Sequence, residues 1–212
     1  MRNFWLVAPF ATWIVLMSVL PATVGGYAVR TAVVAALLVA AAWQGRKTQD
    51  ERPGRCLLSF VSSPLRSSVS RLKSSLLPGL LVGLAVFVIW VLPEQFDSPF
   101  YRRFCILGEG GTQAVAEASA AMIAVRLIGS AFVISVAEEL FFRKWLISFA
   151  GFWWMVVLFA VEHDRWLVGA IAGAIYGLLY LRRGLLAAIV AHATTNLLLG
   201  LWVLKTSQWQ FW

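Results

Sequence analysis

Long runs of apolar residues, separated by short polar or charged segments, make up most of this chain. A helix that crosses a bilayer needs about 20 apolar residues, with roughly 17 to 25 tolerated. One run is too long for a single crossing and is interrupted at Ala150 and Gly151, so we expect a helical hairpin there. The pattern predicts an all-α protein, a polytopic membrane helical bundle of about seven transmembrane helices. The apolar runs cover 5–24, 27–43, 76–93, 120–166, 166–181 and 184–204.

The composition supports this class and excludes several others. Hydrophobic residues make up 60% of the chain and charged residues 13%, whereas about a quarter of an ordinary soluble domain is charged. The mean hydropathy is +0.79. A soluble domain, a disordered chain and a disulfide scaffold are therefore excluded. The net charge of +8 does not indicate a nucleic-acid partner, because the basic residues cluster between apolar runs.

The positions of lysine and arginine predict the orientation, since short cytoplasmic loops carry an excess of both. With the N-terminus inside, twelve of the eighteen basic residues lie on the inner side. We expect residues 1–119 to form N-terminal transmembrane helices with a basic cytoplasmic loop at about 44–75, and residues 120–212 to form a helical core. The expected location is the inner (cytoplasmic) membrane of a bacterium. On the outer side we place Arg102, Arg103, Arg165 and Lys205, with Arg30 and Arg126 snorkelling from helix ends to the outer interface, and the two cysteines, Cys56 and Cys105, fall on opposite sides.

Candidate chemistry is concentrated in the second half of the chain. An ionisable group inside an apolar helix costs on the order of 3 kcal/mol and is by default a candidate functional residue. Glu138, Glu139 and Glu162 lie in or at the edge of apolar helices. The only two histidines, His163 and His192, also lie in or beside membrane spans.

The spacing predicts that the two adjacent glutamates lie close to Arg143 and His163. Glu139 and Arg143 are four residues apart and can pair along one helix face, which leaves Glu138, turned by about 100°, free to face another group. Glu138 and His163 each lie about twelve residues from Gly151, or roughly 19 Å along their own helices at about 1.5 Å per residue. An antiparallel hairpin would therefore hold both at the same depth.

The last apolar run supplies two more polar groups. His192 and Asn196 are four residues apart and share a helix face, with His192 roughly 12 Å from the turn at Gly184. Together the four groups predict a buried cavity in which a carboxylate takes a proton from water, a histidine orients that water and donors stabilise an oxyanion. The structural alternative is that the Glu–Arg and His–Asn pairs only hold helices together, as polar residues in membranes often do.

Three motifs on successive helices resemble those of a known family, the CAAX protease and bacteriocin-processing (CPBP, or Abi) family of intramembrane glutamic proteases, which includes the Ras-converting CAAX prenyl endopeptidases. The resemblance covers about 123–201. It implies that Glu138 and His163 activate water, that His192 and Asn196 form the oxyanion pocket, and that neither a cofactor nor a metal is needed. The motifs are Glu138-Glu139-x-x-x-Arg143, Phe159-x-x-x-His163 and His192-x-x-x-Asn196, and the resemblance gives Glu139 and Arg143 a supporting role and places Phe159 beneath His163.

Three features lie outside these motifs. In this family the connection after the second motif is often longer than the 164–166 segment found here. Glu162 has no role that the resemblance assigns, and we expect it to pair with Arg165. The glycines at four-residue intervals, Gly169, Gly173 and Gly177, predict close helix packing.

The sequence leaves four functions to compare. The first is an intramembrane glutamic endopeptidase that acts on a membrane-associated protein or peptide, such as a prenylated C-terminus or a substrate linked to an exosortase-type sorting system. Its partners would be this substrate and membrane lipid, with no nucleic acid. The second is a zinc peptidase that uses Glu138, His163 and His192, although His-Glu-x-x-His is absent. The others are a non-enzymatic bacteriocin-immunity or scaffold protein and a transporter.

Overall fold

The computed structural model describes residues 3–21, 23–50, 65–96, 98–106 and 120–211. The described residues form helices joined by short connections, with no strand among them. A single long rod, 120–150, alternates between α-helical and π-helical turns. The helices are α1 (Phe4–Val19), α2 (Val24–Asp50), α4 (Leu65–Gln95), α5 (Pro99–Cys105), α9 (Phe152–Val161), α10 (Trp166–Arg183) and α11 (Leu185–Thr206), and the rod consists of α6 (Ala120–Ile128), η1 (Gly129–Ile134), α7 (Ser135–Glu138), η2 (Glu139–Leu146) and α8 (Ile147–Ala150), with a final 3-10 turn, η3 (Trp209–Phe211).

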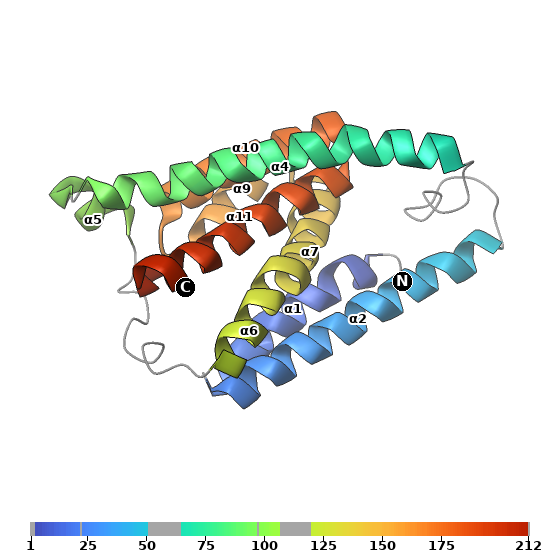
Figure 1. The fold of residues 1–212 in the computed structure, drawn as a ribbon. Coiled ribbons are helices and arrows are strands. Elements are labelled where there is room, and N and C mark those ends of the chain that lie inside the picture. The colour runs from blue at the N-terminus through green and yellow to red at the C-terminus, as the bar shows by residue number, and fades with distance from the viewer. Residues whose placement is uncertain (1–2, 22, 51–64, 97, 107–119, 212) are drawn as a thin grey trace.

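The rod lies between two groups of helices (Figure 1). On one side it contacts α1 and α2, which pack against each other. On the other side it contacts α11, which packs against α4 and α10, and α9 in turn lies against α10. Side chains from both halves of the chain therefore surround the rod.

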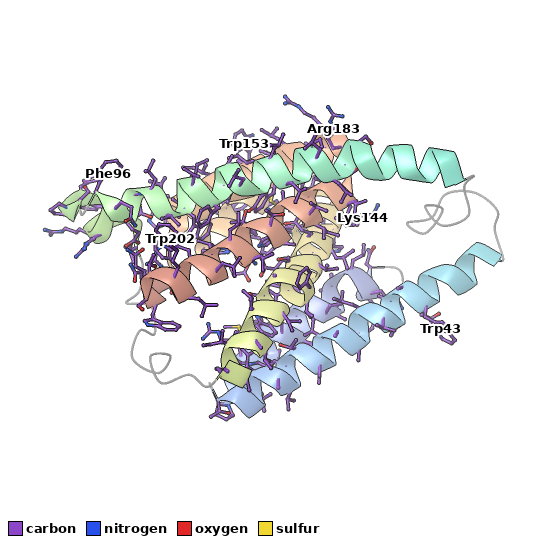
Figure 2. All side chains as sticks on the ribbon, viewed as in Figure 1. Trp43, Phe96, Lys144, Trp153, Arg183 and Trp202 are labelled. Atoms are coloured by element: carbon purple, nitrogen blue, oxygen red, sulfur yellow. The ribbon has the colours of Figure 1, made fainter. Side chains whose placement is uncertain are left out.

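The described helices fit a multi-pass integral membrane protein. Four are long and apolar enough to cross a bilayer: Gly25–Gln44, Ser74–Gln95, Ala120–Ala150 and Leu185–Thr206. Two shorter apolar helices, Phe4–Val19 and Phe152–Val161, add to these. Large apolar side chains point outward, among them Trp153, which is 75% exposed (Figure 2). In a bilayer these side chains would face lipid.

The predicted helical hairpin is confirmed, and its turn depends on glycine. Gly151 ends α8 and precedes α9 with φ 91° and ψ 171°, and Gly184 joins α10 to α11 with φ 85° and ψ 176°. A side chain at either position would strain the backbone, because this region is open essentially to glycine alone. Two sharp turns are thus encoded by single residues.

The predicted close packing along the glycines of α10 is also confirmed. A Cβ at Gly173 would lie 3.0 Å from the Phe159 ring, and one at Gly169 would lie 3.2 Å from the Cβ of His163. The absent side chains let α9 approach α10 closely. The second motif is therefore held in place by the glycines opposite it.

Helix α4 packs closely against α11 in a similar way. A Cβ at Gly83 would lie 2.5 Å from the carbonyl oxygen of Ala191. The hydroxyl of Thr195 donates to the carbonyl of Gly83 at 2.9 Å, and the hydroxyl of Tyr176 donates to Thr195 at 2.6 Å. This chain of contacts joins α4, α10 and α11 beside His192.

One prediction about a basic residue is wrong. Arg30 does not snorkel to an interface: it is only 7% exposed, and its guanidinium lies over the rings of Trp13 and Tyr27 at 5.5 and 5.3 Å. The cation is buried because aromatic rings from α1 and α2 provide a favourable surface for it. Cys105 is a buried free thiol, whereas Cys56 lies outside the described residues.

Candidate active site

The two adjacent glutamates lie where the rod changes its helical form. Glu138 ends the α-helical turn α7, and Glu139 begins the π-helical segment η2. A second π-helical segment, η1, precedes α7. Single π-helical turns are rare and often occur at functional sites. The spacing of polar residues predicts a regular α-helix here, and it carries no signal for the wider turns.

One carboxylate oxygen of Glu139 contacts two basic groups. Its Oε1 lies 3.1 Å from Nη1 of Arg143, and both side chains are fully buried, so the predicted ion pair is present. The same oxygen lies 2.9 Å from Nδ1 of His192. Because a carboxylate can only accept, Nδ1 of His192 carries the proton in this contact.

Glu138 faces the other nitrogen of the same histidine. Its Oε2 lies 3.7 Å from Nε2 of His192. The side chain is buried, and Oε2 has no hydrogen-bond partner. Leaving a buried carboxylate oxygen without a partner costs free energy, so this atom is suited to a water molecule or a substrate group.

His163 follows the end of α9 and is oriented by its own backbone. Its Nδ1 lies 2.7 Å from the carbonyl oxygen of Phe159. A carbonyl only accepts, so Nδ1 is protonated and Nε2 of a neutral ring is left as an acceptor. The imidazole packs between the rings of Phe159 and Trp90, with centroids 4.6 and 5.4 Å away. Trp90 comes from α4, which the motifs do not include.

The ring of Phe159 connects the motifs. The guanidinium of Arg143 lies 4.2 Å from its centroid, and the ring of His192 lies 5.9 Å away at a steep angle. The ring of Tyr176 stacks on that of His192, with centroids 5.1 Å apart. The charged groups of the site are thus enclosed by aromatic rings, which exclude bulk water and strengthen electrostatic interactions.

Asn196 bonds to the rod one turn before the glutamates. Its Nδ2 donates to the carbonyl of Ser130 and to the hydroxyl of Ser135, both at 3.1 Å. His192 and Asn196 therefore lie on the same face of α11, as their spacing predicts, and both face the rod. The two serines are partners that the sequence did not reveal.

The predicted pairing of Glu162 with Arg165 is wrong. Arg165 pairs with Glu94 of α4, with Nε and Oε1 2.7 Å apart. Glu162 instead lies close enough to Glu138 and Arg143 to interact electrostatically with both, and its Oε2 is buried without a hydrogen-bond partner. The pairing prediction failed because it considered only neighbours in sequence, whereas Glu94 arrives from a distant helix.

Glu162 is thus a third carboxylate at the candidate site. The only signal for it in the sequence was its place directly before His163 at the end of an apolar run. Within the part of the chain that the structure describes, no three His, Cys, Asp or Glu side chains form a group that could hold a metal ion.

One comparison with known proteins finds a similarity in the second half of the chain. Residues 120–198 match the model of a family described as type II CAAX prenyl endopeptidase Rce1-like. This segment is therefore similar to the CAAX protease family. The matched segment contains the three motifs and all of the rod, and the CAAX protease family supports peptidase activity at the membrane. No curated protein and no solved structure matches the chain.

Proposed function

We propose that this protein is an intramembrane glutamic endopeptidase that hydrolyses a membrane-associated protein or peptide with water activated by Glu138 and His163. The observation that carries the proposal is the buried Oε2 of Glu138, which has no hydrogen-bond partner and lies beside the Nε2 of His192. Oε2 of the neighbouring Glu139 also has no hydrogen-bond partner, but its Oε1 forms an ion pair with Arg143 and accepts from Nδ1 of His192, whereas no hydrogen bond holds Glu138. Of the two adjacent glutamates, Glu138 is therefore the one available to act as a base.

The reaction begins at the water molecule. Nε2 of His163 accepts a hydrogen bond from the water and orients it, while Glu138 removes a proton. The water oxygen adds to the carbonyl carbon of the peptide bond, and the carbonyl oxygen becomes an oxyanion. The carbon–nitrogen bond then breaks, and the proton held by Glu138 passes to the leaving nitrogen. The products are a carboxylate and an amine.

The oxyanion needs hydrogen-bond donors that are already in place. We assign this role to His192 and Asn196. Glu139 accepts from Nδ1 of His192, so the nitrogen that would donate to the oxyanion is Nε2. Asn196 would turn one N–H from its serine partners towards the oxyanion. Arg143 balances the charge of Glu139 and has no direct contact with substrate in this scheme.

The substrate and location follow from the same reasoning. Apolar side chains cover the outside of the bundle, so a substrate held in or at the bilayer reaches the site more readily than a soluble one. We propose the cytoplasmic membrane of a bacterium as the location, and a substrate of an exosortase-type sorting system as one form of the partner.

The experiment replaces Glu138 with glutamine, which keeps the size of the side chain and removes the base. Membranes of cells that carry the normal protein or Glu138→Gln are compared by quantitative proteomics for peptides with new ends. We expect processing to fall by about 100- to 10,000-fold. The matched control is Asp164→Asn, a change at an exposed acid close to the site, which should leave processing unchanged. Full processing by Glu138→Gln would remove Glu138 as the base.

A further inference from the structure

Glu162 is a carboxylate at the candidate site that the proposed reaction does not use. It follows Val161, the last residue of α9, and its backbone N–H still donates to the carbonyl of Leu158 at 3.2 Å. Glu162 therefore continues the helical spacing and lies on the same helix face as Phe159, three residues earlier. The ring of Phe159 is 4.2 Å from the guanidinium of Arg143. The side chain of Glu162 is thus directed from α9 towards the rod.

The electrostatic interactions of Glu162 agree with this direction. It interacts with Glu138 and Arg143, both on the rod. Its effect on Glu138 is larger than that of His192, although Nε2 of His192 lies only 3.7 Å from the Glu138 carboxylate. Oε2 of Glu138 and Oε2 of Glu162 are buried, and neither has a hydrogen-bond partner among the described residues. Two carboxylates, each with a buried oxygen that lacks such a partner, are therefore neighbours.

The charges at this place balance only if one of the neighbours is neutral. Arg143 already balances Glu139, with which it forms a fully buried ion pair at 3.1 Å. Two further charged carboxylates would repel each other, and burial in a setting of low dielectric increases the cost, so such pairs hold a proton. Glu138 must be charged to accept a proton from water. In the state that reacts, the proton therefore belongs to Glu162.

We propose that Glu162 is a positioning residue, held in its neutral form, whose O–H donates a hydrogen bond to the carboxylate of Glu138 and fixes the orientation of that base. The proposal rests on the proposed function, in which Glu138 is the base, and adds the group that orients it. One proton gives a partner to both unpaired Oε2 atoms, in a hydrogen bond strengthened by the charge of its acceptor. Glu162 passes no proton to the substrate in this scheme.

The first test detects this proton and needs neither substrate nor turnover. A protonated carboxylic acid has a C=O stretching band that a charged carboxylate lacks, and the band shifts in D2O. Infrared spectra are recorded at neutral pH for the full-length protein in lipid nanodiscs. We expect the unsubstituted protein to show such a band and Glu162→Gln to lose it. Asp164→Asn, a change at the exposed neighbouring acid, should keep it.

Glu138→Gln supplies a second comparison in the same spectra. It replaces the acceptor of the hydrogen bond, so the band of Glu162 should shift in frequency and remain present. If Glu138→Gln removes the band while Glu162→Gln retains it, the proton is on Glu138 and the proposal is wrong. Absence of the band from the unsubstituted protein overturns the proposal as well, even where Glu162→Gln does not fold.

The second test asks whether the hydrogen bond serves the reaction. Membranes that carry Glu162→Ala, which has no donor, are compared with normal membranes by quantitative proteomics for peptides with new ends. We expect processing to fall by about 10- to 100-fold, the rate equivalent of one hydrogen bond to a charged group. Glu162→Gln keeps a neutral donor and should recover most of that loss. Equal losses in the two variants, or no loss in either, contradict the positioning role.

The two proposals can fail separately. If Glu162→Gln removes the infrared band while Glu138→Gln retains full processing, the neutral Glu162 is supported and the mechanism with Glu138 as the base is contradicted. If Glu138→Gln is inactive while Glu162→Gln and Glu162→Ala lose equal activity, Glu138 remains the base and the role of Glu162 is overturned.

Discussion

Glu138 and Glu139 are adjacent buried carboxylates, but they contact different groups. Oε1 of the fully buried Glu139 forms an ion pair with Arg143 and accepts from His192, whereas Glu138 has only the 3.7 Å contact of its Oε2 with Nε2 of His192. The sequence predicted this division from the four-residue spacing of Glu139 and Arg143. It could not predict the contact with Glu162, because that contact depends on how α9 docks against the rod.

Removing the two carboxylates near Arg143 should have unequal effects on stability. Glu139→Gln leaves a fully buried arginine without its direct partner, and we expect a loss of about 3 to 5 kcal/mol. Glu162→Gln leaves the 3.1 Å contact between Glu139 and Arg143 intact, so its loss should be smaller. Thermal unfolding of both variants in detergent measures the difference. Equal losses would show that Glu139 is not the main partner of Arg143.

Asn196→Ala tests the oxyanion role. Loss of one oxyanion donor typically costs about a hundred- to a thousand-fold in rate, and we expect peptide processing to fall in that range while the protein remains folded. Thr194→Ala is a suitable control, because the Thr194 hydroxyl bonds only within its own helix, to the carbonyl of Val190. Normal processing by Asn196→Ala would exclude its amide from the reaction.

Helix positions were largely predictable, whereas helix contacts were not. The apolar runs, together with Gly151 and Gly184, predicted the helices and their turns, because length and backbone freedom are local properties. The π-helical turns and the Glu94–Arg165 ion pair were missed, since both arise from packing between distant parts of the chain. The close packing of α4 against α11 was also missed, because the hydrophobic pattern does not show which helices pack together.

A glycine on α4 tests that packing. Gly83→Ala places a methyl group 2.5 Å from the carbonyl oxygen of Ala191, and overpacking of this kind costs about 1 to 3 kcal/mol. Gly25→Ala is the matched control, because a Cβ there meets nothing within 4 Å. Thermal unfolding should show a loss for the first variant and none for the second. Equal stability would contradict the close approach of α4 and α11.

At the scale of the whole molecule, two labelled basic side chains mark one end of the bundle. Lys144 and Arg183 lie towards the end of the bundle at which α2 ends and α4 begins, whereas Phe96 and Trp202 lie towards the opposite end (Figure 2). Lys144 and Arg183 are among the basic residues that the expected orientation places on the cytoplasmic side, and the orientation stays a prediction. The division into residues 1–119 and 120–212 stays a prediction.

The orientation can be tested by labelling. In a variant with Cys56 and Cys105 replaced by alanine, Lys47→Cys should resist an impermeant thiol reagent in intact cells and react after lysis. Labelling in intact cells would place the basic loop outside and reverse the topology.

Metal-free hydrolysis by the protein's own carboxylate is the central feature of the proposed reaction. The most direct measurement is the activity of purified protein dialysed against a strong chelator, with its metal content determined on the same sample and Glu138→Gln treated in parallel. A zinc enzyme would need Glu138, His163 and His192 as ligands, the usual number for a catalytic site. We predict that the metal-free protein remains active and that Glu138→Gln is inactive. Activity that disappears with the metal and returns on adding zinc would contradict the account.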